Sequence, residues 1–343
     1  MKKLFTTVLA LSLSLILLIL SGCTGELPLT FNNAFNGAQE PDSSYRETLT
    51  YSVSYGEYED IANFYLIKKE DFDFSAMGEY KTTFETVTKN DLPASAIATD
   101  IDLTAGTGNI YHVSSKLMLN TKYLVNGKGS GDYVDTLESE IYFLPSGMSF
   151  APIYSNVVQK STILSAENTD GRPVYTVSVI ENQITILYNQ SSYKITYKSG
   201  ENAVENNYGY AFKTIIDNAE LLFALRNVTV DKDVSTNLPV VSASYGEAKT
   251  LSISNVSEFE SNVNLLVNGT TVSEKINVNK LKFNLNGNKN TGISQYLTVQ
   301  KSASANIPSK TLITEYAHAL MCYGTNAVTG ALIYKLVSAE FSA

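Results

Sequence analysis

Apolar and polar side chains alternate along many short stretches of this sequence. In Thr48–Tyr55, for example, Leu49, Tyr51, Val53 and Tyr55 occupy every second position. Successive side chains of a β-strand point to opposite faces, so this pattern predicts a strand with one buried face. The 22 tyrosines, with many Val, Ile, Thr and Phe residues separated by Asn, Ser and Gly, are typical of β-sheets joined by turns. The sequence therefore predicts a mainly β fold with an antiparallel sheet.

The predicted strands follow one another closely along the chain. Asn126-Gly127 predicts a hairpin turn. Glu181-Asn182 predicts a turn between two strands, and a third strand follows, so these three form an antiparallel meander. The predicted strands after the first are Tyr80–Val87, Ser95–Leu103, Ile110–Leu119, Thr121–Val125, Ser139–Leu144, Val174–Ile180, Ile184–Tyr188, Tyr193–Tyr197, Val240–Tyr245, Thr250–Val256, Val263–Val267, Lys275–Val278, Leu281–Leu285, Gln295–Val299, Lys310–Tyr323 and Ala331–Val337.

One principal helix is predicted, over Asp217–Arg226. Asp217 or Asn218 can cap its N-terminus, and Glu220 lies in the first turn, where the helix dipole favours a negative charge. The apolar stripe of the helix consists of Leu221, Leu222 and Leu225. Because β-like segments flank it, we expect the helix to pack on a sheet face or across a sheet end.

The N-terminal residues predict a targeting segment. Met1-Lys2-Lys3 carries two positive charges, and an apolar run follows to Leu20. The lysines hold the N-terminus in the cytoplasm while the apolar run inserts into the membrane. A retained membrane anchor is the alternative to a cleaved signal, but polar residues interrupt the run, which ends on the small residues Ser21-Gly22 beside Cys23. Under either interpretation the rest of the chain faces away from the cytoplasm.

The residues Leu20-Ser21-Gly22-Cys23 fully match a lipobox, and the first 23 residues resemble the signal of a bacterial lipoprotein. The resemblance implies cleavage before Cys23, a diacylglyceryl thioether on Cys23, and a lipid-anchored protein of the cell membrane or envelope. We therefore expect a signal peptide over residues 1–22, a lipidated flexible tether over residues 23–44 and a β-rich body over residues 45–343. Thr24 does not decide between an inner and an outer membrane.

Two further strings, Arg46–Tyr55 and Asp217–Arg226, resemble an uncharacterised family of bacterial envelope β-proteins, similar in shape to the Lol-type lipoprotein carriers. The resemblance implies a curved antiparallel sheet, like an unclosed barrel, with a helical lid over acyl chains. On that interpretation four residues of the helix and of the meander line the ligand site: Leu222, Leu225, Ile184 and Ile186.

An internal repeat is a further hypothesis. Leu124–Gly127 recurs as Leu266–Gly269, and Val158–Ser161 recurs as Val299–Ser302, with the order kept. Two similar halves, about 45–190 and 191–343, would follow. The alternative is that short turn strings recur by chance in a β protein.

Charge and residue inventory exclude several classes of function. The net charge of −9 becomes −11 when Lys2 and Lys3 are removed, which argues against nucleic-acid binding. Lipidation of Cys23 leaves Cys322 as the one remaining cysteine, so no intramolecular disulfide is expected. His112 and His318 are the only histidines, and neither belongs to a recognisable catalytic motif. We predict no catalytic residue, no metal site and no cofactor.

The sequence thus predicts a membrane-anchored, non-catalytic lipoprotein that binds or shields a hydrophobic or extended ligand, such as a lipid or another envelope component. A structural or adhesive surface protein with β-sandwich domains is the alternative. A carboxylate-dependent hydrolase is a third interpretation, because acidic residues cluster at Glu57–Asp60, Glu70–Asp73 and Asp100–Asp102.

Overall fold

The computed structural model describes residues 44–55, 72–73, 78–103, 109–123, 131–146, 149–169, 172–210, 215–227, 235–241, 246–285, 295–301, 304, 306–307, 312–314, 318–321 and 328–342. The signal, most of the tether with Cys23, the carboxylate cluster Glu57–Asp60 and the lone Cys322 lie outside these ranges.

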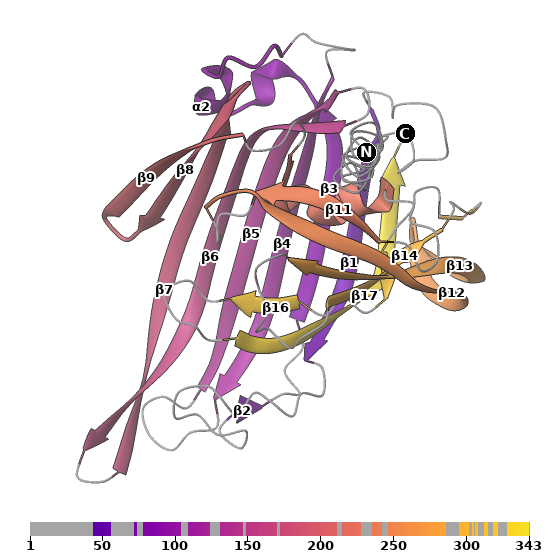
Figure 1. Cartoon of the computed structure of the whole chain (residues 1–343). Helices are drawn as coiled ribbons and strands as arrows, with labels where there is room; N and C mark the ends of the chain where they lie inside the picture. The colour runs from indigo at the N-terminus through magenta and orange to yellow at the C-terminus, as the bar shows by residue number, and fades with distance from the viewer. Residues whose placement is uncertain are drawn as a thin grey trace, which may run out of the picture.

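The N-terminal half of the body is one run of antiparallel neighbours. The sheet order is β1–β3–β4–β5–β6–β7–β8–β9. The short β2 pairs with the end of β4. Figure 1 shows β4–β7 as a broad array of long strands. The bounds are β1 Arg46–Tyr55, β2 Phe72–Asp73, β3 Gly78–Val87, β4 Ile110–Tyr123, β5 Gly131–Ser146, β6 Ser149–Thr169, β7 Arg172–Tyr188, β8 Ser192–Ser199 and β9 Asn202–Gly209.

The C-terminal half continues the same sheet through β17, which lies antiparallel to β1. β12 and β13 form a long hairpin, and β17 also meets the end of β12 in parallel. In Figure 1 the strands β11–β13 cross in front of the long strands. The bounds are β10 Ile216–Asp217, β11 Ser235–Val241, β12 Lys249–Val267, β13 Thr270–Leu285, β14 Gln295–Gln300, β15 Leu312–Thr314, β16 His318–Met321 and β17 Val328–Ser342.

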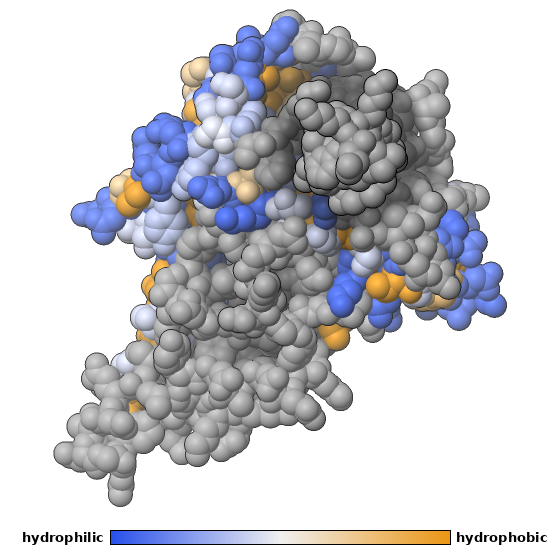
Figure 2. All heavy atoms as spheres, in the orientation of Figure 1, coloured by the Kyte–Doolittle hydropathy of each residue, from blue (hydrophilic) through white to orange (hydrophobic). Residues whose placement is uncertain are grey.

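The sheet is curved and does not close. Among the described residues β9 pairs only with β8, and β10 pairs only with β11. The predicted mainly β, unclosed antiparallel architecture is therefore confirmed. All described strands belong to one sheet, whereas the β-sandwich alternative requires separate packed sheets. Figure 2 shows the projecting β8–β9 hairpin as a largely hydrophilic surface, in keeping with the exposure of nearly all of β9.

The turn predicted at Glu181-Asn182 is wrong, because β7 runs straight through both residues. Asn182 is buried, and its Oδ1 accepts a hydrogen bond from the Tyr197 hydroxyl at 2.9 Å. Glu181 lies opposite Lys160 of β6. Asn182 is thus satisfied by a neighbouring strand, and Glu181 is exposed to solvent, so neither residue needs a turn.

The strand predicted over Ser95–Leu103 is also wrong. A 3₁₀-turn, η4 (Lys89–Asp91), and a short helix, α2 (Ala94–Ile97), occupy this region. Leu92, just before α2, and Ala96 within it are both buried in a core cluster with Tyr142 and Tyr154. Pro93 separates the two elements as the N-cap of α2, and its fixed φ is compatible with a helix start but not with a place in the middle of a sheet.

The predicted helix is confirmed as one helical segment of three consecutive pieces, η5 Asn218–Glu220, α3 Leu221–Ala224 and η6 Leu225–Asn227. Asp217 caps it: its Oδ1 accepts from the Ala219 amide at 2.7 Å, and the Glu220 carboxylate accepts from the Asp217 amide at 2.9 Å. The two carboxyls therefore satisfy each other's backbone in a capping box.

The helical segment fills the core between the long strands and β11–β13. The Phe223 ring stacks on Phe84 with centroids 4.6 Å apart and planes 5° apart, and it also packs against Phe143. Residues of β11 and β12 such as Leu238 and Leu251 belong to the same cluster. The segment therefore covers the apolar face of the sheet as an internal plug.

Two polar anchors hold the plug. Arg226 forms a buried ion pair with Glu47 of β1, 2.5 Å between Nη1 and Oε1. At the other end Asp217 Oδ2 accepts from Ser155 of β6 at 2.6 Å and from Tyr188 of β7 at 2.5 Å. The plug is thus tied to three strands of the sheet.

The capping carboxyls are buried, and this perturbs their acidity. Burial raises the pKa of Asp217, and hydrogen bonds from Ser155, Tyr188 and Ala219 oppose that effect. Burial, followed by the nearby Asp217 charge, raises the pKa of Glu220 well above its usual range. Among the described residues no group donates a hydrogen bond to Glu220 Oε2.

We expect Phe223→Ala to lower the free energy of unfolding by about 3–5 kcal/mol, the usual cost of deleting a buried aromatic ring. Urea titration followed by tyrosine fluorescence measures the loss. Leu222→Ala is the matched control, because Leu222 is only half-buried beside the same cluster and should cost less. Equal losses for the two variants would contradict the assignment of Phe223 as the centre of the plug.

We expect Glu220→Gln to change how stability depends on pH. Wild-type Glu220 keeps its proton in the folded state at pH values where the unfolded chain has lost it, so folding stability falls as pH rises through this range. Glutamine retains the acceptor for the Asp217 amide but does not titrate. The variant should therefore be more stable than wild type by about 1–3 kcal/mol at high pH. If the free energies of unfolding of the two proteins changed in parallel between about pH 5 and pH 9, Glu220 would not have a raised pKa in the folded state.

Candidate functional site

The four predicted ligand-binding residues lie in two separate parts of the core. Leu225 is buried in the plug cluster, and Leu222 packs against that cluster. Ile184 and Ile186 are buried in another cluster with Tyr188 and Tyr193. The structure does not bring the two pairs together in one core cluster.

The cavity beside Leu222 is small, about 20 Å³, and Phe223, Glu47 and Arg226 also line it. A space of this size holds about one water molecule. On the apolar face, the described residues around the plug are thus packed together.

The opposite face of the same strands is polar along its middle, whereas Tyr142, Tyr154 and Leu187 on that face pack in the core cluster that contains α2. The residues that face away from the plug lie in register across seven strands, β1 and β3–β8. The central row, which we call the floor row, consists of Thr48, Thr83, Ser114, Glu140, Asn156, Thr185 and Thr196.

Longer side chains flank the floor row on both sides, two residues away along each strand. One flank, the histidine wall, consists of Arg46, Glu85, His112 and Tyr142. The other flank, the lysine wall, consists of Lys81, Lys116, Glu138 and Val158.

Most floor residues have short side chains and most wall residues have longer ones, so a trough runs across the strands. Between β3 and β6 the trough encloses a hollow of about 400 Å³. Its lining includes the floor residues Thr83, Ser114, Glu140 and Asn156, together with the lysine wall.

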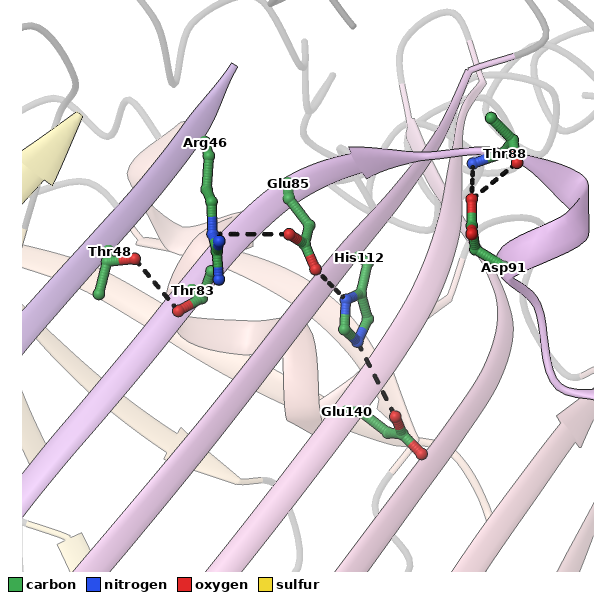
Figure 3. A network of polar contacts seen from close by, with 8 residues as sticks. All are labelled: Arg46, Thr48, Thr83, Glu85, Thr88, Asp91, His112 and Glu140. Carbon is green, nitrogen blue, oxygen red and sulfur yellow. Dashed lines mark hydrogen bonds and ion pairs between the residues drawn. The ribbon is translucent and has the colours of Figure 1, made fainter. Parts of the chain in front are cut away.

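Three residues of the histidine wall form a polar network with Glu140 of the floor row, and Figure 3 shows Arg46, Glu85, His112 and Glu140 as one line across neighbouring strands. Arg46 Nε lies 3.6 Å from Glu85, and Glu85 lies 3.0 Å from His112 Nδ1. On its other side His112 Nε2 lies 3.9 Å from Glu140, and the imidazole stacks on Tyr142 with centroids 4.4 Å apart. Burial raises the pKa of Tyr142 to about 12, so its hydroxyl stays protonated at neutral pH. The network therefore holds the His112 ring in a fixed orientation.

The floor row is also fixed by hydrogen bonds. Asn156 Oδ1 accepts from Gln183 at 2.9 Å and from Thr185 at 3.5 Å. Asn156 Nδ2 donates to Glu140 at 3.4 Å. The Thr48 and Thr83 hydroxyls are 3.3 Å apart (Figure 3). These contacts orient donors and acceptors along the trough before any ligand arrives.

Charge is balanced over the β1–β5 part of the trough, which we call the central trough. Three cations (Arg46, Lys81 and Lys116) accompany three carboxylates (Glu85, Glu138 and Glu140). Lys116 and Glu138 form an ion pair at 2.7 Å. The trough therefore offers hydrogen bonds without a strong field of one sign.

The remaining sequence candidates lie apart from the trough. His318 belongs to β16 at the far end of the chain. Asp100 accepts a hydrogen bond from the Gln190 amide at 2.8 Å, so it ties the α2 segment to the turn between β7 and β8. The described residues include no group of three or more His, Cys, Asp or Glu placed to hold a metal ion. Within the described ranges, none of the helices has the length and apolar character that crossing a membrane requires.

Sequence reasoning missed the trough. The signal was present in the polar partner of each apolar alternation, such as Thr48 beside Leu49. Those polar positions become one surface only when the register of seven strands is known.

Comparisons with known proteins give few matches. No protein-family model matches the chain, and no curated protein matches it. A solved structure similar to this chain is a β-barrel-like protein of the domain of unknown function DUF1849 from Brucella abortus. The two chains share 9% sequence identity and a TM-score of 0.45, over 88% of this chain and 98% of that chain.

Proposed function

We propose that this protein is a membrane-anchored, extracytoplasmic, non-catalytic lipoprotein that binds an extended ligand along the trough. The observation that carries the proposal is the continuous floor row, in which seven strands each contribute one polar side chain to the same line. A ligand that lies along this line can contact many strands at once.

The N-terminal sequence supports the anchor. The lipobox ending at Cys23 provides the lipid attachment, and residues 24–44 can extend at most about 70 Å from it. The trough would therefore work close to a membrane but outside its headgroups.

An extended ligand fits the trough better than a buried acyl chain fits the described core. Opening the core would separate Phe223 from Phe84 and break the buried pair of Arg226 with Glu47. Removing one partner of a buried ion pair costs about 3–5 kcal/mol. The polar face needs no such rearrangement, because its hollow is already present.

For the anchor, we expect Cys23→Ala to abolish labelling by radioactive palmitate, because Cys23 is the residue that would carry the lipid. Autoradiography of gels run on extracts of cells that express each form measures the palmitate labelling. An unlabelled wild-type protein, or a variant that is still labelled, would contradict lipid anchoring at Cys23.

For the trough, we expect a photo-crosslinking amino acid in place of Lys81 to form an adduct in intact cells, because Lys81 is exposed on the lysine wall. The adduct should disappear when Ser114→Tyr fills the floor. A crosslinker in place of Thr271, exposed on β13, is the control and should form no such adduct. No adduct at Lys81, or one that Ser114→Tyr leaves intact, would rule out a ligand in the trough.

A further inference from the structure

We infer that the ligand of the trough is a glycan chain that carries hydroxyl and acetamido groups and runs across the strands. This inference rests on the proposed function, because it names the class of ligand for the same site. It is carried by the spacing, the chemistry and the charge of the floor row and its two walls.

The spacing favours a chain that runs perpendicular to the strands. Neighbouring strands lie about 4.8 Å apart, so the floor row presents one polar side chain at each such step and extends about 29 Å from β1 to β8. Extended peptides usually bind sheets by pairing with a free edge strand. From β3 to β8 every strand is already paired on both edges, so the trough has no free backbone to offer. Recognition must therefore come from side chains.

The floor chemistry suits a polyhydroxylated ligand. The Ser114 hydroxyl can donate one hydrogen bond and accept others, as sugar hydroxyls do, and the Thr83 and Thr185 hydroxyls, which contact Thr48 and Asn156, can still accept. Glu140 supplies acceptors, and Lys81 on the wall supplies donors. The trough thus offers both donors and acceptors to such a ligand.

Charge and polarity argue against other ligands. The three cations and three carboxylates of the central trough balance, so a polyanion such as nucleic acid gains no net attraction. Val158 is the one apolar side chain among the residues that line the hollow. A lipid or an apolar peptide would therefore bury its surface against polar groups and leave their hydrogen bonds unmet.

Val158 is the reason for including acetamido groups in the inferred ligand. It lies two residues from Asn156 on the same strand and face, and opposite Gln183 of β7. A ligand amide can hydrogen-bond to the Asn156 or Gln183 side chain while its methyl group contacts Val158. A plain hexose carries neither the amide nor the methyl group that this arrangement of Asn156, Gln183 and Val158 would contact.

The test is isothermal titration calorimetry on the full-length lipidated protein in detergent, with an N-acetylglucosamine hexamer as the probe. We expect saturable binding that Asn156→Ala weakens at least tenfold and Ser114→Tyr abolishes. Thr271→Tyr on β13 is the matched control and should bind as wild type. Maltohexaose, which lacks acetamido groups, should bind at least tenfold more weakly, and heparin should not compete.

Absence of saturable hexamer binding, or equal binding by wild type and Ser114→Tyr, would overturn the glycan assignment. Equal affinity for maltohexaose would overturn the acetamido assignment, and tighter binding of heparin would indicate a polyanion instead. The crosslinking experiment at Lys81 separates these failures from failure of the proposed function. An adduct that depends on Ser114, with no hexamer binding, would leave an extended ligand of another class in the trough.

Discussion

The stacking of Phe223 on Phe84 is the contact on which the rest of the molecule depends. An antiparallel sheet with one apolar face must cover that face to be stable. Here the cover comes from inside the chain, because the helical segment places Phe223 against Phe84 and Phe143 while β11 and β12 close over it. Once this face is occupied, the surface left for recognition by the long strands is their opposite, polar face.

The polar anchors of the plug fix its position more than they add stability. A buried pair such as Glu47 with Arg226 loses much of its attraction to desolvation, so its net contribution is small. A misplaced plug, however, would leave both charges unpaired. Because Glu47 on β1 is adjacent in sequence to Thr48, the residue that locates the plug also locates one end of the floor row.

The same coupling recurs along the sheet. The floor residues Ser114, Glu140 and Thr185 each neighbour a buried residue in sequence, namely Val113, Ile141 and Ile184. A slip of one residue in any strand would exchange its core residue with its floor residue. Packing on the apolar face therefore holds the trough in register.

This coupling also explains what the sequence could and could not predict. Local signals sufficed for the strand at Leu49 and for the helix capped by Asp217, because each depends on residues a few positions apart. The turn at Glu181-Asn182 was wrongly predicted, because a hydrogen bond from Tyr197 satisfies Asn182 within the strand. The trough was not predictable, because Thr48 and Thr196 share a surface only through the pairings of seven strands. The internal repeat stays a prediction.

A membrane tether suits a site of this kind. Each neutral hydrogen bond to a ligand contributes only about 0.5–1.5 kcal/mol, since the same groups are solvated when the trough is empty. Several neutral hydrogen bonds along the trough would give modest affinity for the ligand, and the loss of any one of them would change that affinity little. Confining the protein and its ligand to one layer outside a membrane raises their effective concentration, and a shallow polar site can then be occupied without tight intrinsic binding. The lipid proposed at Cys23 and the polar floor row would in this way supply complementary halves of one binding function.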